Sequence, residues 1–198
     1  MLALPAAGAE PWARAASRDE AKAALGIPAG RKVCLFMARP AAVKGPGMVL
    51  SAAAHLDGVV LVCAGGAPSK ALDRAAGLMG LDVLQVGGVS TADRELLFSA
   101  ADVLLLGSLV SGCGRGEGYP MVVREALARG LPVAALPSGG LTWDRAGQGL
   151  FLAGSLTPAG LAEAAEMALA FGRFQPVRSD GTMNWDTVAD QVERWILA

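Results

Sequence analysis

The sequence has few of the residues that build disulfide frameworks, metal sites or nucleic-acid surfaces. Its 198 residues include only three cysteines, Cys34, Cys63 and Cys113, and one histidine. The cysteines are too few and too far apart for a disulfide scaffold or a zinc site, which favours a reducing, cytoplasmic location. Charges of both signs are interspersed and sum to −1. Neither a nucleic-acid partner nor a polybasic membrane patch is therefore expected.

Long apolar runs are absent as well. No stretch reaches the roughly 18 residues that a membrane-spanning helix needs, and the first residues lack the basic start and apolar core of a signal peptide. The composition is nevertheless 53% hydrophobic with only 5% aromatics. Alanine accounts for most of this excess, although an exposed face that pairs with another domain would contribute in the same way. A chain of this length fits one well-filled domain.

Strand and helix patterns alternate along the chain. Short apolar runs typical of buried strands cover residues 32–38, 59–64, 83–86, 103–106, 133–136 and 150–152. Helical patterns separate them, so the sequence predicts the α/β class. We expect a single Rossmann-like, doubly wound parallel sheet of about six strands, in the order 3-2-1-4-5-6, with helices on both faces. Residues 1–16 are interpreted as a linker or irregular lead-in, and residues 17–198 as the domain.

Capping signals define several helix starts. Ser17 and Glu20 have the spacing of a capping box, and Thr157 precedes a helix that begins with a proline. Asn184 is predicted to cap a final helix whose apolar stripe includes Trp185 and Trp195. Packing within the domain is the ordinary interpretation of that stripe. The alternative is contact with another domain.

The strand order also predicts where a ligand binds. The chain reverses direction between the first and fourth strands, so the loops that follow them face each other across a crevice. The first of these loops carries Arg39 and Lys44, and the fourth leads to Glu117. We therefore expect two cations and a carboxylate at the carboxyl edge of the sheet.

The stretch 117–140 reads EGYPMVVREALARGLPVAALPSGG. Pro120 suits the first turn of a helix, which places Glu117 in the preceding loop and Glu125 in the second turn. The stretch resembles the Glu-x7-Glu signature of retaining GT-B fold glycosyltransferases of family 4 (glycosyl transferases group 1), in the form EGxPxxxxEAxAxGxPVxxxxxGG. The residues around Arg39 and Lys44 are similar to the ARPxxxKG form of the same family.

The resemblance implies the carboxyl-terminal, donor-binding half of an enzyme. Such an enzyme moves a hexosyl group from a nucleoside diphosphate sugar, a UDP or GDP sugar, to an acceptor hydroxyl with retention of configuration. No cofactor and no essential metal are implied. The implied partner is a missing amino-terminal domain that binds an acceptor glycan or lipid. Through that domain the protein could also lie at the inner membrane face, as an alternative to a purely cytoplasmic location. The isolated domain would be inactive.

Site roles follow from the same resemblance. Arg39 and Lys44 would stabilise the leaving diphosphate, Glu117 would contact the donor sugar, and Glu125 would hold the ribose. The remaining donor contacts would come from the loop near the base and from the start of the helix, at Gly88, Val89, Gly118, Tyr119 and Pro120.

Each charged group also has a simpler interpretation. Arg39 and Lys44 could be ordinary solvated charges of a surface loop. Glu117 could be an acidic residue of the kind favoured near the amino end of a helix. Glu125 could form a surface ion pair with Arg129, four residues later.

Two other functions are alternatives to the enzyme. One is a non-catalytic nucleotide-sugar-binding module that acts with a partner protein. The other is an NAD-dependent oxidoreductase, but the loop after the first strand has no G-x-G-x-x-G to admit a pyrophosphate.

Overall fold

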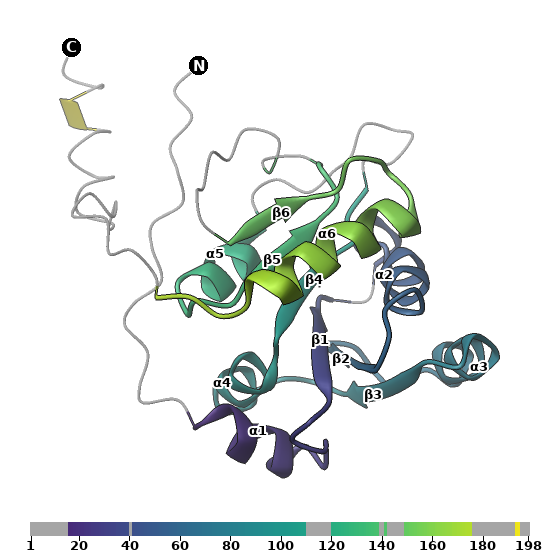
Figure 1. The fold of residues 1–198 in the computed structure, drawn as a ribbon. Helices are drawn as coiled ribbons and strands as arrows, with labels where there is room; N and C mark the ends of the chain where they lie inside the picture. The colour runs from purple at the N-terminus through teal and green to yellow at the C-terminus, as the bar shows by residue number, and fades with distance from the viewer. Residues whose placement is uncertain are drawn as a thin grey trace.

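The computed structural model describes residues 16–39, 41–109, 120–138, 141, 149–175 and 193–194. Within them, one parallel sheet has the order β3-β2-β1-β4-β5-β6 (Figure 1). Its strands are β1 (Lys32–Met37), β2 (Val59–Ala64), β3 (Asp82–Val86), β4 (Val103–Leu106), β5 (Val133–Ala135) and β6 (Leu150–Leu152). The predicted fold class and strand order are confirmed.

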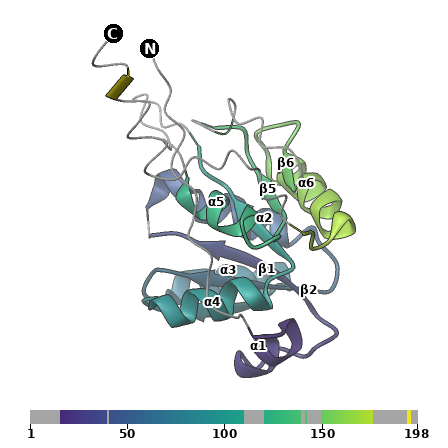
Figure 2. The same cartoon turned by 90° about the vertical axis from the view of Figure 1, so that its left-hand side faces the viewer.

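The helices form a layer on each face of the sheet, as Figures 1 and 2 show. They are α1 (Arg18–Ala24), α2 (Pro46–Ala53), α3 (Lys70–Met79), α4 (Thr91–Ala100), α5 (Met121–Leu127) and α6 (Pro158–Phe171), with a 3-10 turn η1 (Ala42–Lys44) before α2. One core contains residues of α2, α3 and α6, and the other contains residues of α4 and α5.

Strand β1 shows how the sequence builds two cores at once. Cys34 and Phe36 belong to the core under α2 and α6, whereas Val33 and Leu35 belong to the core under α4 and α5. Alternate residues of a strand point to opposite faces. A strand covered on both faces must therefore be apolar at nearly every position.

The predicted caps are largely confirmed. Ser17 and Glu20 form a capping box at α1, and the Thr157 hydroxyl accepts a hydrogen bond from the Gly160 amide at 3.1 Å. Pro120 is a correction, because it stands at the N-cap of α5, one residue before the first turn. Its missing N–H costs nothing there either. The lead-in before residue 16 and the predicted capped helix from Asn184 lie almost wholly outside the described residues.

None of the helices in the described ranges combines the length and the hydrophobicity that crossing a bilayer requires.

Candidate functional site

A cavity of about 390 Å³ opens at the carboxyl edge of the sheet. It lies at the reversal point, where β1 pairs with β4 and the strand order runs outward in both directions. Its lining includes five of the residues predicted from the sequence, namely Arg39, Lys44, Val89, Pro120 and Glu125. These residues come from the loops after β1 and β3 and from the start of α5, so the fold gathers segments that are far apart in the chain.

The other predicted site residues have different outcomes. Gly88 precedes Val89 and is exposed, but it does not line the cavity. Glu117, Gly118 and Tyr119 lie outside the described residues, so their roles stay predictions.

The cationic side of the cavity comes from the loop between β1 and α2. Arg39 is exposed, and within the part of the chain that the structure describes it makes no hydrogen bond or ion pair. Lys44 closes η1, and Gly45 follows it in the left-handed conformation before Pro46 begins α2. A planar guanidinium and a point ammonium on one short loop suit an anion with several oxygens.

The opposite wall holds an ion pair that the sequence did not predict. Nη2 of Arg94, in the first turn of α4, donates to Oε2 of Glu125 in α5. The Glu125 side chain is only 16% exposed. Both residues line the cavity, so Arg94 fixes the orientation of the carboxylate there. The sequence signal that was available is the position of Arg94, five residues after Val89 and near the start of the next helix.

The predicted alternative for Glu125, a surface pair with Arg129, is wrong. The Arg129 guanidinium pairs instead with Glu95 and lies over the Phe98 ring, 4.6 Å from its centroid. Arg129 does donate to the backbone carbonyl of Glu125 at 2.7 Å. Its i+4 position therefore stabilises the helix backbone and leaves the Glu125 carboxylate to the cavity.

A second cavity, of about 250 Å³, shares Ala38 and Arg39 with the first. Phe36 and Cys63 line it, so it lies on the other face of the sheet. The Gln85 side chain in its lining already has hydrogen-bond partners, because its amide accepts from the Ser69 N–H and donates to the Ser69 carbonyl. An anion bound to Arg39 could therefore lie in either cavity. The first cavity adds a cation and a carboxylate, whereas the second is mostly apolar.

The described cysteines are inert at neutral pH. Burial raises the pKa of the Cys34 and Cys63 thiols to about 12, so both stay protonated. In the described part of the chain no cluster of three or more His, Cys, Asp or Glu side chains could hold a metal ion.

Comparison with known proteins gives a family and relatives. The family model described as "Glycosyl transferases group 1" matches residues 17–169. A D-inositol 3-phosphate glycosyltransferase from Mycobacterium bovis is 37% identical over 136 residues, which are 65% of this chain and 27% of that protein.

Solved structures share the fold. Sucrose-phosphate synthase from Thermosynechococcus elongatus superposes with a TM-score of 0.70 at 24% identity, over 92% of this chain and 50% of the synthase. HepE from Anabaena, solved in complex with UDP and glucose, superposes with a TM-score of 0.68 at 21% identity, over 91% of this chain and 52% of HepE. This chain thus spans about a quarter of the curated relative and about half of each of these structures.

Proposed function

Because the chain belongs to the glycosyl transferases group 1 family and folds as one half of a GT-B architecture, we propose that it is the donor-binding domain of a retaining glycosyltransferase. The donor is a nucleoside diphosphate sugar. Its hexosyl group moves to an acceptor hydroxyl, and the configuration at the anomeric carbon is retained.

The observation that carries this proposal is the cavity at the reversal point of the sheet. It presents Arg39 and Lys44 on one loop, Glu125 on α5, and Val89 on a third segment. A nucleoside diphosphate has the complementary parts, which are an anionic diphosphate, a ribose with two hydroxyl donors and a flat base. No single predicted residue identifies the ligand, but the three chemistries converge on one cavity.

The chain's own residues have distinct tasks in this proposal. Arg39 and Lys44 neutralise negative charge on the departing diphosphate, which grows as the bond to the anomeric carbon breaks. Glu125, oriented by Arg94, accepts the ribose hydroxyls through lone pairs that the ion pair leaves available. Glu117 is the carboxylate that would stabilise positive charge on the sugar.

Transfer requires a second domain. An acceptor must be held in near-attack geometry while water is excluded from the sugar, and in GT-B proteins this happens in a cleft between two halves. The extent of the match supports this view, since the chain covers about half of each of the two solved structures. We therefore propose an acceptor-binding partner domain. The isolated chain then binds the donor without transferring its sugar.

The test is calorimetric titration of the purified chain with UDP, GDP and ADP, followed by incubation with the matching sugar donors and an acceptor panel. We expect one nucleotide to bind and no acceptor-dependent turnover. Failure of all three nucleotides to bind would sink the donor-domain assignment. Robust turnover would show that a second domain is not needed.

A further inference from the structure

The loop that carries Arg39 and Lys44 meets the end of β4 backbone to backbone. Gly45 is buried, with a left-handed φ of +61°, and a Cβ placed on it would overlap the carbonyl oxygen of Gly107. A Cβ placed on Gly107 would lie 2.8 Å from the Gly45 oxygen and 2.8 Å from Cγ2 of Val49. Two glycines are therefore needed for this approach.

A hydrogen bond reinforces the contact on the other side of Lys44. The Leu109 amide donates to the Val43 carbonyl at 3.1 Å. Residues 43 and 45 are thus both tied to the segment that follows β4. The backbone of Lys44 lies between these two ties, so the end of β4 determines where the ammonium group enters the cavity.

We propose that Gly45 and Gly107 are positioning residues of the donor site. They touch no ligand. Their close approach sets the position of Lys44 against the end of β4, and so sets the strength of diphosphate binding. This inference rests on the proposed function, because the phosphate role of Lys44 belongs to it.

The central experiment compares Gly107→Ala with Gly47→Ala. Gly107 has an ordinary φ, so alanine is tolerated by its backbone, and the new Cβ must push Gly45 away. Gly47 lies in the first turn of the same helix α2, is exposed, and has nothing within 4 Å of an added Cβ. The control therefore adds the same methyl group to the same region without the collision.

The readout is a ratio of affinities. We expect Gly107→Ala to weaken the nucleoside diphosphate by about tenfold or more, as when a charge-assisted hydrogen bond is lengthened or lost. Binding of the corresponding nucleoside, measured by NMR titration, should change less than about twofold, because it lacks phosphate. Gly47→Ala should leave both affinities unchanged. A merely structural role would lower the melting temperature and leave the ratio unchanged.

A second pair of variants covers the case in which Gly107→Ala does not fold. Leu109→Pro removes the amide that bonds to Val43, whereas Leu109→Ala keeps it and removes only the side chain. The same selective loss of diphosphate binding is expected for the proline variant alone. A folded Gly107→Ala or Leu109→Pro protein with an unchanged ratio would overturn the inference. Failure of the unaltered chain to bind any nucleoside diphosphate would overturn the proposed function itself, and the inference with it.

Discussion

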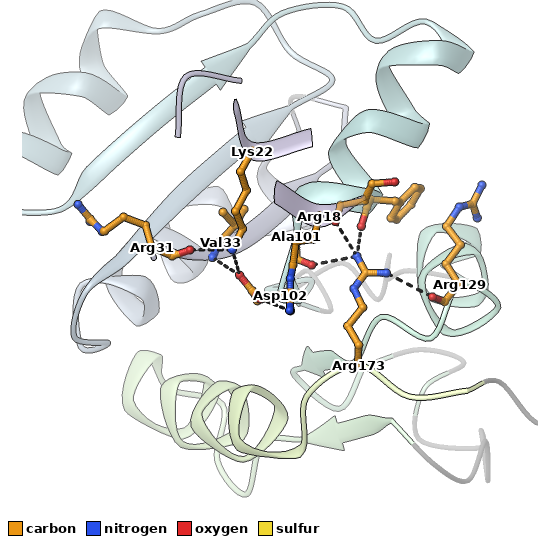
Figure 3. A network of polar contacts seen from close by, with 10 residues as sticks. Arg18, Lys22, Arg31, Val33, Ala101, Asp102, Arg129 and Arg173 are labelled. Atoms are coloured by element: carbon orange, nitrogen blue, oxygen red, sulfur yellow. Dashed lines mark hydrogen bonds and ion pairs between the residues drawn. The ribbon is translucent and has the colours of Figure 1, made fainter. Parts of the chain in front are cut away.

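Two charged side chains at opposite edges of the same sheet, Asp102 and Arg39, have opposite surroundings. At the amino edge, Asp102 is buried just before β4, and three groups satisfy its carboxylate (Figure 3). Lys22 donates to it at 2.8 Å, Arg18 at 3.0 Å and the Val33 amide at 2.9 Å. At the carboxyl edge, Arg39 is exposed and makes no such bond within the described residues.

Arg173 extends the pattern of the amino edge. Its guanidinium donates to the carbonyls of Phe98, Ser99 and Ala101 at the end of α4, and to that of Arg129 (Figure 3). Burial is the main cause that lowers the pKa of Arg173 to about 10, so it remains a cation at neutral pH. Carbonyls at the end of a helix lack intrahelical partners, and a cation there stabilises them.

Asp102 and its partners stabilise the fold, whereas Arg39 is available to bind a ligand. Around Asp102 the chain supplies its own counter-charges, so substitutions there should change stability. Around Arg39 the structure leaves a guanidinium facing a cavity, so substitutions there should change binding.

The largest effect should follow the loss of Asp102. Asp102→Ala leaves the buried Lys22 ammonium without its carboxylate, and the free energy of unfolding should fall by about 3–5 kcal/mol. Chemical denaturation measures this loss. Because an apolar replacement of a buried pair is often nearly neutral, the double variant Lys22→Met with Asp102→Ala should be more stable than Asp102→Ala. An equally unstable double variant would show that the pair is not the cause.

Arg39→Ala should produce the converse result. Affinity for the nucleoside diphosphate should fall by about 1.5–3 kcal/mol, because a charge-assisted bond to phosphate is lost. Stability should change by less than about 0.5 kcal/mol, as is usual for an exposed residue. Calorimetry and thermal unfolding measure the two quantities. The matched control is Arg31→Ala at the amino edge, which removes bonds to the Gly58 and Val59 carbonyls and to Asp82. It should lower stability and leave affinity unchanged.

Glu125→Gln tests the carboxylate wall of the cavity. The preference for a ribonucleotide over its 2′,3′-dideoxy counterpart should fall by about tenfold, because a neutral amide accepts hydroxyl hydrogens less strongly than a carboxylate. Arg94→Ala should reduce the same preference by less, since it frees the carboxylate without removing it. An unchanged ribose preference in Glu125→Gln would show that Glu125 serves only as the structural partner of Arg94.

The smallest effects should come from the two capping boxes, formed by Ser17 with Glu20 at α1 and by Ser90 with Asp93 at α4. Ser17→Ala at α1 and Ser90→Ala at α4 should each lower the melting temperature by about 2–4 °C. Only Ser90→Ala should also weaken nucleotide binding, because α4 carries Arg94 into the cavity. Equal effects on binding would contradict the separation of the two edges.

The capping box at α4 should also make the stability of the protein depend on pH. Hydrogen bonds from the Ser90 hydroxyl and amide lower the pKa of Asp93 below its ordinary value. The stabilisation is therefore present above that ordinary value and is lost as the pH falls through the lowered one. Ser90→Ala should weaken this acid dependence, which thermal unfolding between pH 2 and pH 6 would measure.

Much of the fold could be predicted because its signals are local. Alternating apolar runs and helical patterns, together with the right-handed rule for parallel connections, lead to one strand order. That order then places the loop with Lys44 opposite the loop after the fourth strand, which leads through Glu117 to the helix that carries Glu125. The cavity lining could therefore be predicted in part without any contact information.

What the sequence did not reveal depends on contacts between distant residues. Lys22 and Asp102 are 80 positions apart, and no spacing rule connects them. Arg94 was missed for the same reason. An i+4 rule offered Arg129 as the partner of Glu125, but the packing of α4 beside α5 supplied a different arginine. The closeness of Gly45 and Gly107 likewise appears only once the sheet has formed.

The most direct test of the account is an NMR map of nucleotide binding on the isotopically labelled chain. We predict that the nucleoside diphosphate that binds shifts the amide signals around Arg39 and Lys44, at Val89, and at the start of α5, while those around Asp102 stay unchanged. Without ligand, the spectrum of Arg39→Ala should match that of the unaltered chain. On addition of the nucleotide, the variant should lose most of these shifts. Shifts centred on Cys63 and Gln85 would place the ligand in the second cavity, and an unresponsive spectrum would contradict the claim that the carboxyl edge is a donor site.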